Sequence, residues 1–446
     1  MNPLTRAPAP PADVLIAGAH VLDPRAGIDA PHDVLVRDGA IAELGAPGSL
    51  SAPEGGETVD GAGRHLFCAF VDPHVHLRTP GQEHKEDIAT GTASAAAGGY
   101  CAVVGMPNTA PVVDSAPIVR SLRDAATRDA RIPVGFMAAI TRGLEGTQLT
   151  EMAELSDAGA LGFTDDGRPL VSAGMLRRAL QYQRLSGGVI ALHEEDPTLS
   201  GDGAMHEGEV SALLGIGGIP SVSESTMIAR DAALAGYEDA RIHVQHLSAA
   251  ESVSAVAAAK AQGVRISAEA SPHHLTLTHL ALRERLDTRL KMNPPLRAET
   301  DRLALIEGLR DGTIDCIATD HAPHARSEKE VPFEEAPMGT TGLETAFAAL
   351  HTELVQPGVL PLALVVERLS DGAALLGLPT PRIEAGAPAD LCLVDLEAAW
   401  QVGEEPYASR SENCCFAGRT LHGRVLLTVA AGSIAHRDRS LQPVAA

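Results

Sequence analysis

The chain has 446 residues and carries 35 Lys and Arg against 58 Asp and Glu, a formal net charge of −23. This charge argues against a nucleic-acid partner and against an anionic membrane surface, because both require a basic face. Hydrophobic residues make up 45% of the chain, which excludes global disorder, and aromatic residues make up only 3%. We therefore expect a large core built mainly from Ala, Val, Leu and Ile.

The cellular compartment is predicted from two further features. The sequence has no run of about 20 apolar residues, and its first residues do not resemble an apolar leader. Its six cysteines form no C-x-x-C pair, which is typical of free thiols in a reducing compartment. These features predict a cytoplasmic protein.

The two ends of the chain have β-strand patterns. Residues 13–45 alternate in the manner of strands, and Asp38-Gly39 in VLVRDGAIAEL predicts the tight turn of a hairpin. Similar patterns recur at 389–397 and 423–436. Neither end is long enough to bury a sheet face alone. We therefore expect residues 1–65 and 383–446 to form one small β-sandwich domain beside a central domain of residues 66–382.

The central part alternates short apolar segments with Ala-rich segments that suit helices. Eight segments are typical of buried parallel strands: 66–77, 100–108, 132–141, 160–167, 188–196, 241–248, 264–274 and 314–324. Helices are predicted between most of them, for example over 172–186, 223–237, 249–262 and 299–311. This repeated alternation predicts an α/β fold, a (β/α)8 TIM barrel. A doubly wound open sheet is the alternative, but it usually has fewer strands, and no nucleotide-binding glycine loop is present.

Metal-binding residue types end several of the predicted strands. Asp72, His74 and His76 form D-x-H-x-H, and the strand period of two places them on one face, where both imidazoles can reach one ion. The fifth, sixth and eighth strands end in His193, His246 and Asp320. Because strand ends meet at one rim of a TIM barrel, this set predicts a divalent-metal site, with Zn²⁺ favoured by its imidazole content.

The fourth strand ends in Thr164-Asp165-Asp166-Gly167, where a carboxylate could bridge two metal ions or could cap a turn. Lysine occurs at only four positions in the chain, and none lies between Lys85 and Lys260. In related metal barrels a carbamylated lysine often takes this bridging position. No lysine is available for it here, so any bridge must come from an Asp.

Other polar residues beside these motifs suit an anionic substrate. They are Arg78, Asn108, Asn293 and His324. The planar fork of a guanidinium matches the two oxygens of a carboxylate, so Arg78 is the candidate for binding one. We expect a buried or supporting position for His243 and a supporting or solvated position for Glu194-Glu195, whereas His273 and His274 could orient ligands or cap a loop.

The motifs are similar to those of a known family. The string FVDPHVHLRTPGQEHKED resembles the first signature of dihydroorotases in the amidohydrolase superfamily. MPNTAPVVD, GFTDDG, VQHLS, PHHL, KMNPPLR and CIATDHAPH resemble the later signatures, in the same order and over essentially the whole chain. The lysine-free fourth strand resembles the class I bacterial branch, in which Asp replaces the carbamylated Lys.

This resemblance implies two Zn²⁺ ions bridged by Asp166 and a hydroxide, with Asp165 as the second choice for the bridge. One ion would be held by His74, His76 and Asp320, and the other by His193 and His246. The implied substrate-binding residues are His76, Arg78, Asn108, Asn293, His324, Met338 and Gly339, the last two through their backbone. Relatives often have Phe or Pro in place of Met338, and a cysteine-containing version of HEED after the fifth strand.

The implied activity is the reversible cyclisation of N-carbamoyl-L-aspartate to L-dihydroorotate and water in de novo pyrimidine (UMP) biosynthesis. Asp320 would act as general acid and base in this reaction. The alternatives are another cyclic-amide hydrolase, of allantoinase or hydantoinase type, and a non-catalytic scaffold for aspartate transcarbamoylase. A small-molecule substrate is expected, with neither nucleic acid nor membrane as partner. A homo-oligomer such as a dimer, and a complex with aspartate transcarbamoylase, both stay open.

Overall fold

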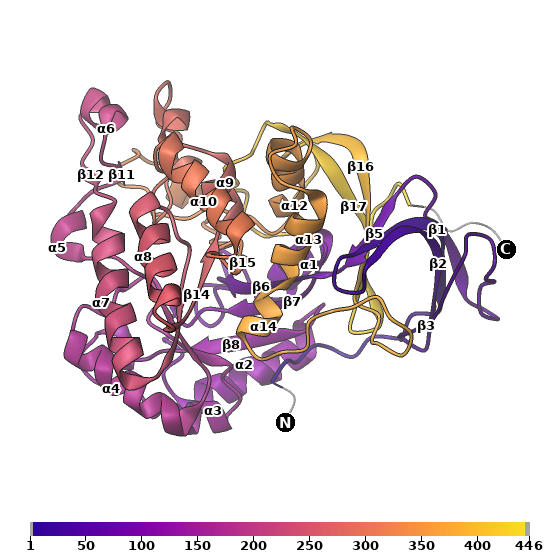
Figure 1. Ribbon diagram of the computed structural model, residues 1–446, viewed down its shortest axis with the longest axis horizontal. Coiled ribbons are helices and arrows are strands. Elements are labelled where there is room, and N and C mark those ends of the chain that lie inside the picture. Colours follow the sequence, from indigo (N-terminus) through magenta and orange to yellow (C-terminus); the bar gives the residue numbers. More distant parts are fainter. Residues whose placement is uncertain (1–2, 442–446) are drawn as a thin grey trace.

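The computed structural model describes residues 3–441 and has two parts, a barrel with its surrounding helices and a β-sheet beside it (Figure 1). Among these residues, none of the helices combines the length and the apolar character needed to span a bilayer. The six cysteines are unpaired thiols, as expected, and only Cys415 is not fully buried.

The barrel consists of eight short parallel strands that follow one another in chain order around the sheet. They are β6 (Phe70–Val75), β7 (Tyr100–Gly105), β8 (Val134–Ala138), β9 (Gly162–Thr164), β10 (Val189–Leu192), β13 (Arg241–Val244), β14 (Arg265–Ala270) and β15 (Cys316–Ile317). The chain after β15 returns to β6, where Val75 forms a parallel bridge with His321 and the backbone N–H of His76 donates to the carbonyl of His321 at 2.8 Å. The predicted TIM barrel is confirmed, and each strand lies within a predicted segment.

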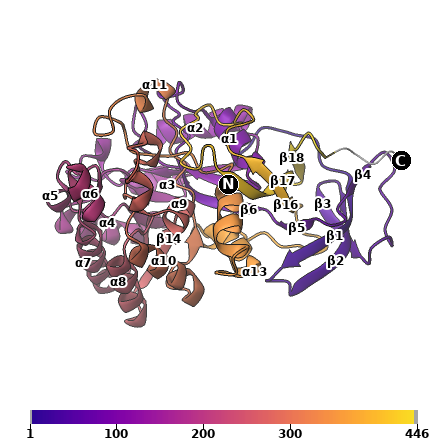
Figure 2. The same cartoon turned by 90° about the horizontal axis from the view of Figure 1, so that it is seen from above.

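A helix follows each barrel strand and covers its outer face (Figures 1 and 2). These helices are α1 (Ile88–Ala97), α2 (Ala116–Asp129), α3 (Met152–Asp157), α4 (Ala173–Ser186), α7 (Val222–Glu238), α8 (Ala250–Ala261), α10 (Glu299–Asp311) and α13 (Leu362–Ser370). Two of them, α1 and α4, begin at N-cap residues: the side chains of Asp87 and Ser172 accept hydrogen bonds from the backbone N–H groups of Thr90 and Met175. The four helices predicted by range begin and end within one residue of the prediction.

The remaining elements of the barrel domain are short and lie in the connections between these strands and helices. Between β10 and α7 come α5 (Pro197–Ser200), β11 (Met205–His206), α6 (Glu209–Leu214) and β12 (Gly218–Ile219). Later come α9 (Pro272–Thr276), α11 (Arg326–Lys329), α12 (Ala346–Leu350), α14 (Gly372–Leu375), the 3-10 helices η1 (Arg142–Leu144), η2 (His279–Leu282) and η3 (Thr288–Leu290), and the π-helix η4 (His351–Val355). The sequence did not predict the excursion between β10 and α7, because its glycine-rich segment has no clear periodicity.

Strands from both chain ends form a second sheet, in the order β18-β17-β16-β5-β1-β2-β3, with β4 paired to β1. They are β1 (Val14–Asp23), β2 (Ile28–Arg37), β3 (Ala40–Gly45), β4 (Glu57–Asp60), β5 (His65–Cys68), β16 (Leu391–Gln401), β17 (Thr420–Ala430) and β18 (Ser433–Arg437). Residues from both ends share one buried cluster, among them Ile16, Val36, Leu393 and Val429. The sheet therefore curls around one core, as the predicted β-sandwich requires, while the division at residues 65 and 383 stays a prediction.

Four aromatic rings connect the sheet to the barrel. Phe67 of β5 and Phe70 of β6 both pack against Phe347 of α12, each with ring centroids 5.7 Å apart, and Phe70 meets the ring of Tyr100 at 5.6 Å. All four side chains are buried. A chain with few aromatic residues thus places a cluster of them where β5 of the sheet meets the barrel domain.

The predicted hairpin is confirmed. Arg37 of β2 pairs with Ala40 of β3, which leaves Asp38 and Gly39 as a two-residue turn with φ of 51° and 76°. A Cβ atom at Gly39 would lie 2.8 Å from the carbonyl oxygen of Gly432, which belongs to the turn between β17 and β18. Gly39 therefore satisfies both the left-handed turn and a close approach of two backbones.

We predict that Gly39→Ala lowers the free energy of unfolding by about 2–3 kcal/mol, since it combines left-handed strain with this contact. Gly48→Ala is the matched control, because Gly48 has φ of 77° and no atom within 4 Å of the added Cβ. It should cost about 1 kcal/mol from strain alone. Urea-induced unfolding measures both, and equal losses would contradict the role of the contact.

Candidate metal centre and active site

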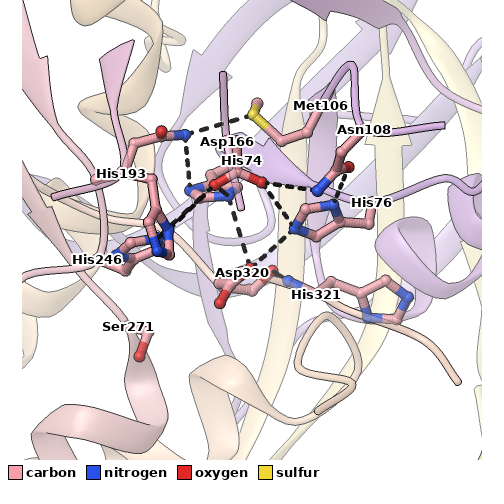
Figure 3. A network of polar contacts seen from close by, with 12 residues as sticks. His74, His76, Met106, Asn108, Asp166, His193, His246, Ser271, Asp320 and His321 are labelled. Carbon is pink, nitrogen blue, oxygen red and sulfur yellow. Dashed lines mark hydrogen bonds and ion pairs between the residues drawn. The ribbon is translucent and has the colours of Figure 1, made fainter. Parts of the chain in front are cut away.

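The carboxyl ends of the barrel strands bring together six buried residues that can bind metal (Figure 3). They are His74 and His76 at the end of β6, Asp166 after β9, His193 after β10, His246 after β13 and Asp320 after β15. None is more than 7% exposed. The structure thus places every predicted metal-ligand residue in one cluster.

One group within this cluster consists of His74, His76 and Asp320, whose ligand atoms lie within 4.8 Å of one another. His76 Nε2 lies 3.1 Å from Asp320 Oδ1, and His74 Nε2 lies 3.6 Å from the same oxygen. His74 Nε2 is buried and has no hydrogen-bond partner. A buried nitrogen without a partner, directed at carboxylates, fits a site for a divalent cation.

A second group of His74, Asp166 and His246 has the same compactness. Asp166 also adjoins the first group, because its Oδ2 is 3.5 Å from His76 Nε2, while its Oδ1 is 3.7 Å from His193 Nδ1 and 3.8 Å from His246 Nε2. The His193 and His246 nitrogens are themselves 2.9 Å apart. The donor set therefore fits metal binding on both sides of Asp166.

The neighbouring carboxylate, Asp165, does not join the cluster. Its Oδ1 accepts the backbone N–H groups of Ile140 and Thr141 at 2.8 and 2.9 Å, and its Oδ2 accepts the Thr141 hydroxyl. Spacing alone left both Asp residues as candidates for the bridge. In the structure, Asp166 lies beside the histidines, whereas Asp165 hydrogen-bonds to the loop after β8.

The carboxylates of the cluster are ionised. Burial alone would raise the pKa of Asp320, but the hydrogen bond from His76 and the nearby imidazoles lower it to about 2. Burial likewise acts against the charge of Asp166, and the surrounding histidines hold the pKa of that carboxyl well below its usual range. The cluster thus offers negative charge to a cation even though solvent is largely excluded.

Glu269 of β14 supports this cluster from behind. Its Oε1 accepts from His74 Nδ1 at 2.6 Å and its Oε2 accepts from His243 Nε2 at 3.1 Å. The carboxylate therefore fixes the tautomer of His74 that leaves Nε2 facing the cluster. Sequence reasoning missed Glu269, although a lone acidic residue inside a buried strand pattern is a signal that it has partners. His243 lies buried behind the ligands, as expected from the sequence.

Glu194 and Glu195, the acidic pair after β10, lie in different surroundings. Glu195 accepts from Asn293 Nδ2 at 2.6 Å and lies 3.4 Å from His193 Nε2, which places it behind a ligand. Glu194 is buried, and burial together with Asp231 raises its pKa well above the usual range.

The two histidines that the sequence could not assign lie in the loop after β14. His274 contacts Ser271 Oγ at 2.7 Å and the carbonyl of Pro294 at 2.9 Å, so it holds the loop in place. His273 Nε2 is buried and has no hydrogen-bond partner. Neither residue belongs to the compact metal groups.

A cavity of about 220 Å³ opens beside the cluster. Its walls include all the predicted substrate-binding residues: His76, Arg78, Asn108, Asn293, His324, Met338 and Gly339. Burial lowers the pKa of Arg78 to about 10, so its guanidinium stays cationic at neutral pH. Its Nε donates to the carbonyl of Pro323 at 3.0 Å, and its Nη2 lies 3.5 Å from His324 Nε2.

Asn108 lines the cavity and also hydrogen-bonds to two residues of the metal-binding cluster. Its Oδ1 accepts from His76 Nδ1 at 2.9 Å, and its Nδ2 donates to Asp166 Oδ2 at 3.2 Å. Because this amide contacts one residue from each side of the cluster, it orients both relative to each other (Figure 3). Neither contact was predicted from the sequence.

Three residues of the site have left-handed backbone conformations, Arg78 with φ of 56°, His246 with 35° and Asp320 with 48°. Such values are uncommon for residues other than glycine, and they cost free energy that the surrounding structure must supply. Their concentration around one cavity marks it as the functional site.

Comparison with known proteins agrees with this geometry. The sequence model of the family described as "Dihydro-orotase-like" matches residues 63–252. The dihydroorotase of Pelotomaculum thermopropionicum is 45% identical over 430 residues, which cover 96% of this chain and 100% of that protein. The chain belongs to the dihydroorotase family. A second member, from Desulforapulum autotrophicum, is 45% identical over 94% of this chain and 98% of its own length.

The fold is also similar to that of related cyclic-amide hydrolases. The L-hydantoinase (dihydropyrimidinase) of Arthrobacter aurescens superposes with a TM-score of 0.85 and 25% identity over 97% of each chain. The dihydropyrimidinase of Brevibacillus agri gives a TM-score of 0.82 and 22% identity over 96% of each chain. Dihydroorotase family members and hydantoinases thus share the barrel together with the attached sheet.

We predict that Glu269→Gln weakens the binding of a divalent metal ion by about 10–100-fold, because an amide cannot accept from both His74 and His243. Isothermal titration of the metal-free protein with Zn²⁺ measures the change. Asp33→Asn is the control, since Asp33 is equally buried and accepts the backbone N–H groups of Gly18 and Leu50 in the sheet. Unchanged affinity in Glu269→Gln would show that Glu269 does not prepare His74 for metal.

Proposed function

We propose that this protein is a dihydroorotase, which interconverts N-carbamoyl-L-aspartate and L-dihydroorotate. The observation that carries the proposal is that the predicted metal-ligand cluster and the predicted substrate residues adjoin one cavity, in a chain that matches a dihydroorotase over 96% of its length. The proposed reaction breaks or forms the amide bond between the ring nitrogen and the neighbouring carbonyl carbon, with water consumed or released.

Zinc is the proposed cofactor, because imidazole nitrogens dominate the donor set. His74, His76 and Asp320 would hold one ion, His193 and His246 the other, and Asp166 would contact both. When bound, divalent ions polarise a carbonyl group and lower the pKa of water from about 16 to about 7. The unpartnered His74 Nε2 and the two-sided position of Asp166 support this assignment.

Asp320 is the proposed general acid and base. Its carboxylate is ionised, lines the cavity and lies at the side of the cluster nearest His76. In hydrolysis it would accept a proton from the attacking water and deliver it to the ring nitrogen as the amide bond breaks. Cyclisation would use the same proton path in reverse.

The substrate carboxylate is proposed to bind where Arg78 and His324 adjoin. Arg78 carries the fixed positive charge of this wall, and its guanidinium fork suits two carboxylate oxygens. Burial and the charge of Arg78 lower the pKa of His324 to about 3, so its imidazole is neutral and can only hydrogen-bond. Asn293, Asn108 and the backbone of Met338 and Gly339 would enclose the rest of the ring.

The same wall favours a carboxylate-bearing ring over the rings of the hydantoinase and allantoinase alternatives. A ring without a carboxylate would leave much of the charge of the buried Arg78 guanidinium uncompensated, which disfavours the binding of such a ring. The scaffold alternative is disfavoured because all six predicted ligand residues are present in one buried cluster.

We expect purified, zinc-loaded protein to hydrolyse L-dihydroorotate, with little turnover of hydantoin or allantoin. Absorbance assays on the three substrates, with zinc measured on the same sample by atomic absorption, test this expectation. Faster turnover of hydantoin or allantoin, or a zinc-loaded protein inert toward L-dihydroorotate, would reject the proposed substrate.

We predict that Asp320→Asn lowers kcat for L-dihydroorotate by about 10²–10⁴-fold, because the amide cannot accept a proton. The histidines and Asp166 remain, so zinc should still bind, and the metal content should be measured beside kcat. Asp33→Asn, a buried carboxyl change in the sheet, should leave kcat within about twofold. Near-normal turnover in Asp320→Asn would remove its role as acid and base.

The proposed pathway position, pyrimidine biosynthesis, agrees with a cytoplasmic location and a small-molecule substrate. Formation of a homodimer and association with aspartate transcarbamoylase stay predictions. Light scattering of the purified chain, alone and mixed with the transcarbamoylase, distinguishes the two.

A further inference from the structure

The segment between β16 and β17, residues 402–419, connects two strands of the sheet and contacts the barrel loops that line the cavity. Val402, Cys414 and Phe416 are buried in an apolar cluster shared with Met292 and Ala349 of the barrel domain. The backbone of Arg410 donates to Glu86 at 3.1 Å, and Ser411 Oγ donates to the carbonyl of Lys85 at 2.6 Å. The segment is therefore docked firmly on the barrel.

Asn413 in this segment is 4% exposed, and its carboxamide makes three hydrogen bonds to backbone groups. Its Oδ1 accepts from the N–H of His324 at 3.0 Å. Its Nδ2 donates to the carbonyls of Ala322 and Gly339, each at 3.1 Å. Both N–H donors and one of the two oxygen lone pairs of the amide are thus used, on partners 74 to 91 positions away in the sequence.

All three partner residues line the cavity. They belong to its two adjoining walls, the segment 322–324 after Asp320 and the backbone at 338–339, which also meet where His324 Nε2 contacts the carbonyl of Met338 at 2.9 Å. One buried side chain therefore bridges the two walls, in addition to the backbone N–H of Ala322 that donates to the carbonyl of Thr340 at 2.8 Å. Asn413 belongs to neither compact metal group.

The backbone of Asn413 adds to the same support. Its carbonyl accepts from Thr340 Oγ1 at 3.0 Å and from the N–H of Thr341 at 3.3 Å. Thr341 also forms a parallel bridge with Cys414, and Thr340 forms one with His321. The segment thus continues the pairing that closes the barrel, one layer further out from the cavity.

We propose that Asn413 is a positioning residue for substrate binding, which holds His324 and Gly339 at the distance that the carboxylate-bearing ring requires. The proposal rests on the proposed function, since it assigns Asn413 to the same cavity. It also gives the sheet a part in the active site, because the residue supports the cavity wall from behind and belongs to the connection between two of the sheet's strands.

Two variants test the proposal. Asn413→Asp keeps the shape and the acceptor for His324 but turns a carboxylate oxygen toward two carbonyls, which repel it. Asn413→Ser shortens the side chain and removes the simultaneous contact with both walls. Ser411→Ala is the control, because Ser411 is also buried in this segment but its hydroxyl bonds to Lys85, away from the cavity wall.

The measurements are KM and kcat for L-dihydroorotate, the dissociation constant of orotate by calorimetry, zinc content and the unfolding midpoint. We expect KM and the orotate constant to rise together by about tenfold or more in both Asn413 variants, with kcat within about threefold and zinc content unchanged. Ser411→Ala should lower the unfolding midpoint without changing KM.

Three outcomes are decisive. If both Asn413 variants keep KM and orotate affinity within about threefold of the unmodified chain, the positioning role is wrong. If zinc content and kcat fall together instead, Asn413 acts on the fold or the metal centre, and the proposal is equally wrong. If the unmodified, zinc-loaded chain does not turn over L-dihydroorotate, the proposed function fails, and orotate binding still tests Asn413 by itself.

Discussion

The active site depends on one contact, the closure of the barrel between its first and last strands. Thr319 donates its backbone N–H and its hydroxyl to Asp72, 247 positions away in the sequence, and His76 donates its backbone N–H to His321. With these bonds made, His74 and His76 at the end of β6 face Asp320. Every other ligand reaches the cluster from a strand between these two. The metal centre therefore forms only when the barrel is complete, which joins catalytic competence to the global fold.

Closure gathers several ionisable groups away from water, and their mutual arrangement offsets the cost of burial. Glu269 lies between His74 and His243, Asn108 lies between His76 and Asp166, and each supporting group fixes a ligand in one orientation. The left-handed backbone at Asp320 directs its carboxylate toward His76. Strain and burial at this rim are compensated by the apolar core below it, where the aromatic and aliphatic side chains lie.

The sequence predicted the parts of this architecture that depend on local periodicity. Apolar segments of the right length gave the eight barrel strands, and residues at their ends, such as His193 and Asp320, could be assigned to one rim because parallel strands end together. Sequence spacing could not show which of Asp165 and Asp166 faces the metal-binding cluster, since adjacent residues after a strand end differ only in which loop they face. Glu269 was hidden within an apolar strand. Asn413 gave no signal, because its contacts join the connection between two sheet strands to a barrel loop far away in the sequence.

The attached sheet takes part in this site because of its order. Since β5 precedes β6 directly in the chain and pairs with β16, the sheet joins the barrel at the start of its first strand, and β17 contacts β7, α1 and α12. The rings of Phe67, Phe70 and Phe347 hold that junction in one arrangement. A connection between β16 and β17 then needs only to extend over the closing strands to reach the wall formed by residues 322–324 and 338–339. A sheet paired elsewhere on the barrel could stabilise it equally well, but it could not place a carboxamide behind the substrate wall.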